Sequence, residues 1–173
     1  EGSPVPEIYH RLYGVSSYRQ DLSYPPGLNG DTIGGDAASM PLASESVSKM
    51  ALHCSFEHFE GDSDSRFIRE IERVLRPGGM VCIVPLYFHE EYAIQTDPNV
   101  AIIDDVYFED SAVLYCSEKW GNRHARFYDP ERFVSRIVSQ SGRLHITVYC
   151  IDNYCEVDSS CYARFAAVVS KRL

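Results

Sequence analysis

Residues 67–84 read FIREIERVLRPGGMVCIV, and this stretch decides the fold. Its first half places apolar side chains at helical spacing from Phe67 to Leu75, with charged side chains on the opposite face. Pro77-Gly78-Gly79 then stops the helix. The unbroken apolar run that follows, over 80–84, is typical of a strand covered on both faces. A helix, a tight glycine turn and a buried strand together predict a crossover unit of the β-α-β type.

Helix and strand signals alternate on both sides of this unit. The expected elements are, in chain order, a helix over 4–13, strands over 15–22, 32–33 and 47–54, a helix that opens at 129–131, and strands over 144–151 and 163–170. Residues 86–127 show no regular pattern, and a segment of this length is typical of a lid or a substrate-binding insertion. The sequence therefore predicts an α/β fold in a single domain that spans residues 1–173.

Composition and charge exclude several classes of function. The 173 residues carry 25 acidic and 16 basic side chains, for a formal net charge of −9. A negative surface repels phosphate backbones, so no nucleic-acid partner is expected. No apolar run approaches the ~20 residues that a membrane helix needs, and no signal-peptide pattern is present. We therefore expect no membrane partner and a cytoplasmic location.

No two of the six cysteines form a C-x-x-C pair, and no histidine lies at zinc-finger spacing from them. Cys150, Cys155 and Cys161 lie close together in the sequence, so a disulfide or a metal there stays open. The preferred interpretation is reduced thiols and no metal site, as is usual in the cytoplasm.

Polar side chains follow several of the expected strands. Asp21 suits a carboxylate that accepts both hydroxyl groups of a ribose, and Asp36 suits an acceptor for an exocyclic amine. Each alone is equally typical of a solvated strand end or a turn. His53, Glu57 and His58 form the densest polar group and could act as base, orienting group or substrate contact. Alternatively, His53 faces the sheet edge while Glu57 and His58 begin a surface helix.

The insertion 86–127 is rich in aromatic and polar side chains. They include Tyr87, His89, Trp120, Asn122 and His124. Such a lining suits a small polar organic substrate, although a solvent-facing loop would also hold these residue types. Trp120 is the single Trp of the chain, and a large aromatic residue is less expected in a solvent-facing loop.

Three segments resemble a known family. They are GGDAASMPL over 34–42, HCSFEHF over 53–59 and REIERVLRPGG over 69–79. Their order and separation resemble class I S-adenosylmethionine-dependent methyltransferases, in particular the type 11-like group that acts on small molecules. The resemblance implies a Rossmann-like, mostly parallel sheet whose last strand is antiparallel, and S-adenosylmethionine as cofactor.

The resemblance also implies roles for individual residues. The positions that match cofactor-binding positions of the family are Asp21 for the ribose, Asp36 and Ala37 beside adenine, His53 and Cys54 near the methionine moiety, and Gly2 and Ser3 at the end of the glycine-rich loop. The family's first strand and the start of that loop have no counterpart here, which predicts truncation at the N-terminus. A homo-oligomer, an upstream segment or an altered topology would then cover the open sheet edge.

The sequence therefore predicts methyl transfer from S-adenosylmethionine to an oxygen or nitrogen of a small molecule. His53, His58 or His124 is the candidate base that takes the acceptor's proton. The alternative is a non-catalytic methyltransferase-like module that binds a ligand or a partner. A nucleotide-binding oxidoreductase is a third possibility, because Asp21 would serve a dinucleotide ribose equally well, but the Gly-Gly-Asp loop and the Pro-Gly-Gly turn argue against it.

Overall fold

The computed structural model describes residues 4–101 and 106–173, so the predictions for Gly2 and Ser3 lie outside the described residues. The helices of the described part are α1 (Val5–Tyr13), α2 (Ser63–Val74), α3 (Pro98–Ala101), α4 (Pro130–Arg136), α5 (Tyr154–Val157) and the 3₁₀ helices η1 (Phe56–His58) and η2 (Val138–Gln140). No helix within these ranges is long and apolar enough to cross a membrane.

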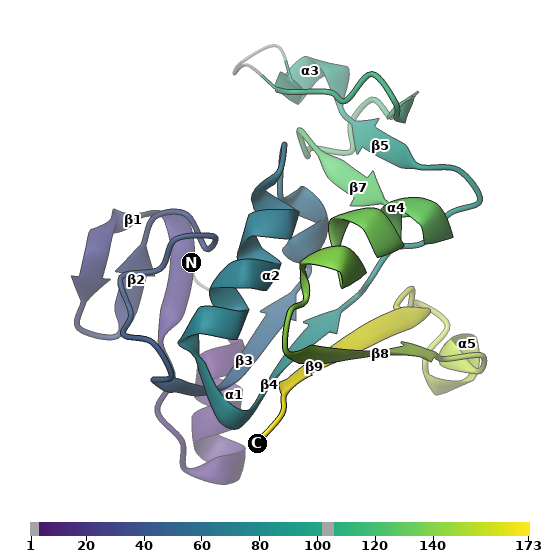
Figure 1. Cartoon of the computed structure of the whole chain (residues 1–173). Coiled ribbons are helices and arrows are strands. Elements are labelled where there is room, and N and C mark those ends of the chain that lie inside the picture. The colour runs from purple at the N-terminus through teal and green to yellow at the C-terminus, as the bar shows by residue number, and fades with distance from the viewer. Residues whose placement is uncertain (1–3, 102–105) are drawn as a thin grey trace.

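The strands form three separate sheets (Figure 1). They are β1 (Arg19–Asn29), β2 (Thr32–Gly34), β3 (Val47–His53), β4 (Leu75–Val84), β5 (Ala93–Thr96), β6 (Val113–Cys116), β7 (Ala125–Phe127), β8 (Leu144–Cys150) and β9 (Phe165–Lys171). The central sheet has the order β3-β4-β9-β8, while β1 pairs with β2 and β6-β5-β7 form a third sheet. We call the third one the lid sheet.

Strand directions in the central sheet confirm the predicted fold class. β3 and β4 are parallel, and β9 runs antiparallel to both of its neighbours, β4 and β8. The last strand of the chain is therefore the one that runs against the other three. This is the Rossmann-like arrangement, with an antiparallel last strand, that the sequence predicts.

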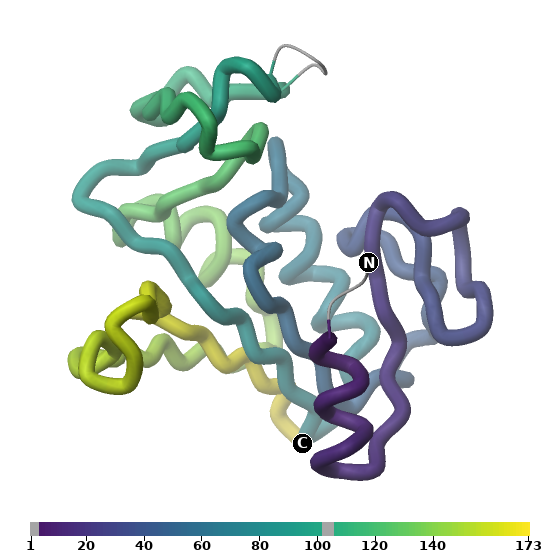
Figure 2. Tube along the Cα trace, turned by 180° about the vertical axis from the view of Figure 1, so that it is seen from behind, coloured from purple at the N-terminus to yellow at the C-terminus, as the bar shows by residue number. Residues whose placement is uncertain are grey.

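The α2–β4 unit forms the core, but β4 differs from its prediction: Pro77-Gly78-Gly79 lies within the strand, and the run over 80–84 buries one face, with Val81 and Ile83 buried and Met80 exposed. Phe67, Ile68, Ile71 and Val74 on α2 are at most 1% exposed, and they pack with the buried residues of β4. Helices α2 and α4 cover one face of the central sheet, and α1 lies on the opposite side (Figures 1 and 2). α1 has no fully buried residue, so the core lies mainly between the sheet and α2 with α4.

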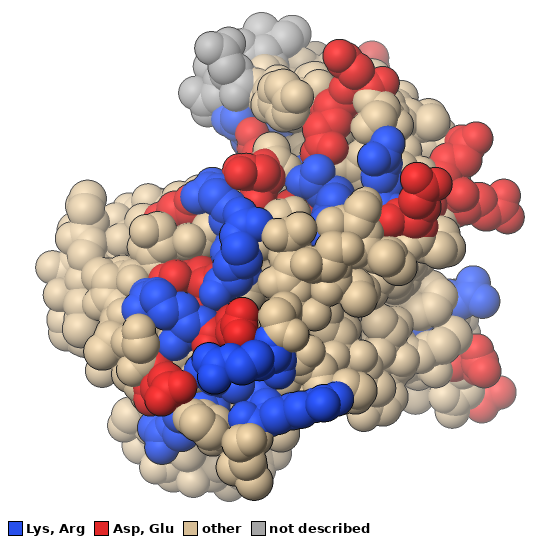
Figure 3. Space-filling model, in the orientation of Figure 1, with Lys and Arg blue, Asp and Glu red and all other residues tan. Residues whose placement is uncertain are grey.

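The polar face of α2 carries three basic side chains, Arg66, Arg69 and Arg73. Figure 3 shows Lys and Arg gathered in a band over this face. Arg66 pairs with Asp36 at 2.9 Å and Arg73 pairs with Glu70 at 2.6 Å. The band is thus largely neutralised by its own acidic partners, and Arg66 ties the loop after β2 to α2.

Two further sequence predictions about local structure are wrong. Residues 86–127 are not irregular, because β5, β6 and β7 lie within them and form a sheet. The strand expected over 15–22 begins later and continues through Pro25 and Pro26 to Asn29. Its backbone passes so close to β2 that a Cβ on Gly34 would lie 2.0 Å from the carbonyl oxygen of Pro25. Glycine permits this contact, and a Pro-Pro-Gly signal alone does not reveal it.

A buried ion network holds the lid sheet against α2. Asp64, which is fully buried at the start of α2, lies 3.0 Å from Arg126 of β7 and 2.7 Å from Arg136 of α4. The Tyr128 hydroxyl donates to Asp64 at 2.7 Å. Arg126, also fully buried, and Arg136 both contact Glu109 as well. The two guanidinium groups thus face two carboxylates, and their charges balance.

The network changes the ionisation of Asp64. Burial acts to raise its pKa, but the hydrogen bond from Arg136 and the charge of Arg126 outweigh burial and hold the pKa below its usual value. Asp64 is therefore an anion wherever the protein is folded at neutral pH.

We expect Asp64→Asn to lower the free energy of unfolding by about 3–5 kcal/mol, because it leaves buried guanidinium groups without a balancing charge. Urea denaturation at neutral pH measures the effect. Asp62→Asn is the matched control. Asp62 pairs with Arg66 on the exposed side of the same end of α2, so its loss should cost less than about 1 kcal/mol. Equal losses in the two variants would contradict the role given to the network.

The same carboxylate predicts how stability responds to acid. Because the pKa of Asp64 is lower in the folded protein than in the unfolded chain, its contribution is complete above the unfolded value of ~4 and is lost as the pH falls below it. The difference in urea midpoint between the wild-type protein and Asp64→Asn should therefore shrink as the pH falls from neutral through this range. A constant difference would show that Asp64 does not titrate as described.

Candidate functional site

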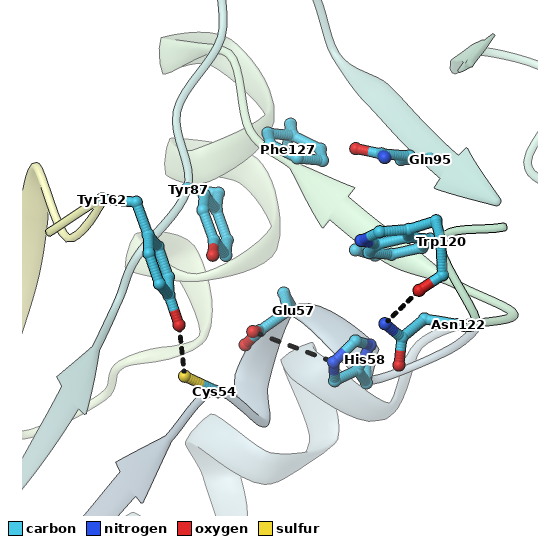
Figure 4. A pocket seen from close by; sticks show the side chains of 10 residues that line it. Cys54, Glu57, His58, Tyr87, Gln95, Trp120, Asn122, Phe127 and Tyr162 are labelled. Carbon is cyan, nitrogen blue, oxygen red and sulfur yellow. Dashed lines mark hydrogen bonds and ion pairs between the residues drawn. The ribbon is translucent and has the colours of Figure 1, made fainter. Parts of the chain in front are cut away.

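A cavity of about 430 Å³ lies where the turn after β3 meets the lid sheet (Figure 4). Its polar lining comes from Cys54, Glu57, His58, Gln95 and Asn122. Its aromatic walls come from Tyr87, Trp120, Phe127 and Tyr162, with Ala125 between them. The volume lies within the range of ~300–1,000 Å³ typical of small-molecule sites.

Cys54 forms the turn that brings the polar residues into the cavity. Its φ of 49° is in the left-handed region, which is unusual for a residue with a side chain. Its N–H donates to the carbonyl of Val84, which fixes the turn against β4. Its Sγ lies 3.2 Å from the hydroxyl of Tyr162. Such backbone conformations are common at functional sites, where the surrounding structure supports their strain.

Glu57 on η1 is the buried acid of the cavity. It is 5% exposed, and its Oε1 lies 3.8 Å from Nε2 of His58. Its Oε2 has no hydrogen-bond partner among the described residues, although it is shielded from solvent. Burial raises the pKa of Glu57, while its own backbone N–H and the charge of His58 oppose this effect. A buried carboxyl group with a raised pKa is a candidate for proton transfer or ligand binding.

His58 lies beside Glu57 and is held by the lid sheet. Its Nδ1 lies 2.5 Å from the carbonyl oxygen of His124. A carbonyl only accepts, so Nδ1 carries the proton, and Nε2 is left to face Glu57. The imidazole ring lies 6.3 Å from the Trp120 ring, centroid to centroid. These contacts fix the orientation of the ring at the cavity wall.

The aromatic walls are rigid and carry neutral hydroxyl groups. Tyr87 and Phe127 pack with their ring centroids 5.0 Å apart. Burial, and secondarily the charge of Glu57, raises the pKa of Tyr87 well above its usual value. The hydrogen bond to Cys54 raises the pKa of Tyr162. Both phenols therefore stay protonated at neutral pH.

The structure places the predicted bases in three different environments. His58 lines the cavity, whereas His53 is exposed and its Nε2 lies 3.2 Å from the Tyr9 hydroxyl on α1. His124 is buried behind the wall, and neither of its ring nitrogens has a hydrogen-bond partner in the described structure. Burial, with the charge of Arg126, lowers the pKa of His124 to about 3, so its ring is neutral.

The predicted cofactor residues divide between two sheets. Asp21 is exposed on β1, and its Oδ1 accepts from the N–H and hydroxyl of Ser23. Asp36 follows β2 and accepts from Arg66 and from the N–H of Ala38. Ala37 is half-buried against the core. Cys54 and His53 follow β3 of the central sheet, so the structure brings Cys54 and His58 into one cavity but not the remaining predicted residues.

The sequence analysis does not single out four of the lining residues, which are Gln95, Ala125, Phe127 and Tyr162, and the first and last of these show why. Gln95 lies on β5, a strand that the irregular pattern of the insertion does not reveal. Tyr162 precedes β9 and reaches Cys54 across 108 positions of sequence. Neither position carries a local signal, because only the tertiary contact brings it to the cavity.

The cysteines of the chain are free, and its possible metal ligands do not cluster in the described residues. All six cysteines lie in the described ranges and are free thiols, so Cys150, Cys155 and Cys161 form no disulfide here. Across residues 4–101 and 106–173, no group of three or more His, Cys, Asp or Glu side chains is arranged to hold a metal ion.

The family described as "Methyltransferase domain" matches residues 9–83, from α1 to the end of the buried part of β4. The matched stretch is similar to this family of methyltransferase domains. The match includes the turn at Cys54 together with Glu57 and His58, and it confirms the resemblance inferred from the sequence. The comparison with curated proteins finds no match.

Solved structures similar to this chain show the same fold. The Burkholderia thailandensis 1,6-didemethyltoxoflavin-N1-methyltransferase, with its ligand and S-adenosylhomocysteine bound, has 11% identity and a TM-score of 0.58, with 96% of this chain and 66% of that one covered. An S-adenosylmethionine-dependent methyltransferase from Mesorhizobium loti has 13% identity and a TM-score of 0.54, with 91% and 81% covered.

A third match is a chain in the complex between the Haloferax volcanii Trm112 methyltransferase activator and a putative methyltransferase. It has 14% identity and a TM-score of 0.54, with 96% of this chain and 77% of that one covered. These identities support a shared fold and nothing finer. S-adenosylmethionine, the cofactor predicted from the sequence, is confirmed as the cofactor of this class of domain.

The cavity thiol should be distinguishable from the core thiol by alkylation. Cys54 is exposed, whereas burial raises the pKa of Cys82 on β4 and lowers its thiolate fraction. With iodoacetamide at mildly alkaline pH, Cys54 should react several-fold faster than Cys82, as measured by mass spectrometry of the labelled peptides. Faster labelling of Cys82 would contradict the placement of these two side chains.

Proposed function

We propose that the chain transfers a methyl group from S-adenosylmethionine to an oxygen or nitrogen of a small molecule held in the cavity. The observation that carries the proposal is the cavity itself. It opens at the strained turn after β3, the parallel edge strand of the central sheet, within the segment that matches the methyltransferase family. In sheets of this type, ligands bind beyond the carboxyl ends of the strands.

The residues around β2 fit a ribose-bearing cofactor. Gly35 follows β2 with a φ of 121°, and a Cβ built there would meet nothing within 4 Å, so its backbone faces open space. The exposed Asp21 lies beside it, with the carbonyl of Asp21 accepting from the Gly35 N–H at 3.3 Å. We assign Asp21 to the ribose hydroxyls, Asp36 and Ala37 to adenine, and His53 and Cys54 to the methionine end. Gly2 and Ser3 are proposed to complete this site.

The bound cofactor supplies a methyl group that is already activated on a sulfonium, so the protein mainly has to align the acceptor. Tyr87, Trp120 and Phe127 would exclude water and hold an organic acceptor between their rings. His58, with its Nδ1 proton committed to the His124 carbonyl, has Nε2 available for a proton from the acceptor. Among the predicted bases, His58 is the one that lines the cavity, and His53 and His124 would act only after rearrangement.

The lid sheet supports the role proposed for residues 86–127. It contributes Gln95 and Trp120 to the cavity and is held to α2 by the ion network rather than by strand pairing. We assign it as a substrate-binding lid of the single domain.

A non-catalytic binding or partner module is the second candidate. It is favoured by the division between sheets, because β3 pairs only with β4 in the described part of the chain and β1–β2 stand apart. A free strand edge attracts a further strand, for example from a second copy of the chain. In that case the protein would bind neither S-adenosylmethionine nor its product, and it would elute as a dimer in size-exclusion chromatography.

Titration calorimetry with S-adenosylhomocysteine tests the proposal. We expect saturable binding, weakened about tenfold by Asp21→Asn, which removes a charge-assisted hydrogen bond to the ribose. Asp31→Asn is the matched control, because Asp31 pairs with Arg19 near the same sheet and is assigned no ligand. Absence of binding to the wild-type protein would favour the non-catalytic module. Equal losses in both variants would reject the role of Asp21.

A further inference from the structure

The proposed methyl transfer assigns no role to one buried polar atom beside the cavity. Oε2 of Glu57 is shielded from solvent and has no hydrogen-bond partner in the described residues, although Glu57 lines a cavity. A buried carboxylate oxygen without a partner costs free energy, and native structures normally satisfy such atoms. In Figure 4 the Glu57 carboxylate lies between Cys54 and His58, facing the space that the aromatic rings enclose.

The surroundings of this oxygen favour a positively charged ligand. None of the described residues that line the cavity is Lys or Arg, and the imidazole beside Glu57, that of His58, lies 3.8 Å from Oε1 rather than Oε2. Trp120, Tyr87 and Phe127 present aromatic rings, whose faces attract cations. A carboxylate within aromatic walls therefore combines an ion-pair partner with cation–π contacts.

We infer that the acceptor is an organic amine, bound as an ammonium whose N–H donates to the Glu57 carboxylate, which turns Oε2 toward the ligand, while the carbon skeleton of the amine lies between the aromatic rings. This inference rests on the proposed function for its methyl-transfer step, but the amine site itself is defined by the cavity. It makes nitrogen, rather than oxygen, the atom that is methylated.

Oxygen acceptors fit the same site less well. A phenol must develop negative charge on oxygen as it is methylated, and that charge would form beside Glu57 without a cation in the lining to balance it. Carboxylate or phosphate acceptors would meet the same repulsion. An alcohol could donate one hydrogen bond to Oε2, but it would gain neither the ion pair nor the cation–π attraction.

For an amine acceptor, Glu57 takes the place of His58 as the proton acceptor, and the chemical step balances. The Glu57 carboxylate takes one proton from the ammonium and becomes a carboxylic acid, which frees the nitrogen lone pair. Nitrogen forms a bond to the methyl carbon as the carbon–sulfur bond breaks, and the electron pair of that bond stays on sulfur as a neutral thioether. The methylated ammonium product leaves, and Glu57 returns its proton to water.

Equilibrium binding of three matched probes tests the inference without turnover. The probes are phenethylamine, 2-phenylethanol and 3-phenylpropionate, which present a cation, a neutral hydroxyl and an anion on the same phenyl group. Calorimetry and the fluorescence of Trp120, the single Trp of the chain, measure binding near neutral pH. We expect phenethylamine to bind at least about tenfold tighter than the alcohol, and the anion to bind weakest.

Glu57→Gln separates the ion pair from the aromatic contacts. It keeps the size of the side chain and removes the charge, so phenethylamine should lose about tenfold in affinity or more while 2-phenylethanol changes little. Glu90→Gln makes the same substitution at an exposed position outside the lining and should leave all three affinities unchanged. Circular dichroism and urea unfolding of both variants confirm that they fold.

The outcomes separate this inference from the proposed function. Preferred binding of phenethylamine that disappears in Glu57→Gln supports the amine site. Equal or tighter binding of the alcohol or the anion, absence of phenethylamine binding, or an unchanged preference in Glu57→Gln overturns it. If S-adenosylhomocysteine binds but phenethylamine does not, the acceptor class is wrong and the proposed function stands. If phenethylamine binds and S-adenosylhomocysteine does not, the amine site stands and methyl transfer is rejected.

Discussion

The buried ion network around Asp64 is the interaction on which the candidate site depends. Arg126 contacts Asp64 and also donates to the backbone carbonyls of Phe59 and Gly61, directly after Glu57 and His58. One guanidinium group therefore joins the lid sheet to α2 and to the end of η1. Burying these charges is expensive, and the cost is offset only because each guanidinium meets carboxylates and carbonyls in good geometry. The cavity exists because this network fixes its two sides relative to each other.

The sequence predicts the central part of the fold well because its signals are local. The apolar positions of α2 recur within one helix, and the run over 80–84 lies within one strand, so periodicity alone identifies both. The lid sheet escapes the same reasoning. β6 is exposed along its length and β7 has three residues, so neither shows the alternation that marks a half-buried strand. Pairing between short segments far apart in the chain leaves little trace in either segment.

The candidate site, like the fold, is predicted from the sequence in part. Cys54, Glu57 and His58 follow a recognisable strand and lie in the cavity, as a rule about strand ends suggests. The same rule cannot say which way a side chain points, and His53 faces α1 although it is adjacent to Cys54. His124 is a residue type that often acts as a base, but burial lowers its pKa to about 3, so the ring accepts a proton poorly at neutral pH. Burial depends on the tertiary fold, so residue type alone does not establish a role.

The division into three sheets has a consequence for how the molecule responds to stress. No strand ladder joins β6-β5-β7 to the central sheet in the described chain, and side chains such as Arg126 and Tyr128 hold the two layers together. Separating the layers therefore breaks ion pairs and ring contacts but leaves every ladder hydrogen bond of the central sheet intact. Two cooperative units with different free energies of opening result, and amide hydrogens of β5 and β7 would exchange ahead of those of β4 and β9. A ligand would enter where the lid sheet opens. The rate of entry would then depend on breaking side-chain contacts rather than hydrogen bonds between strands.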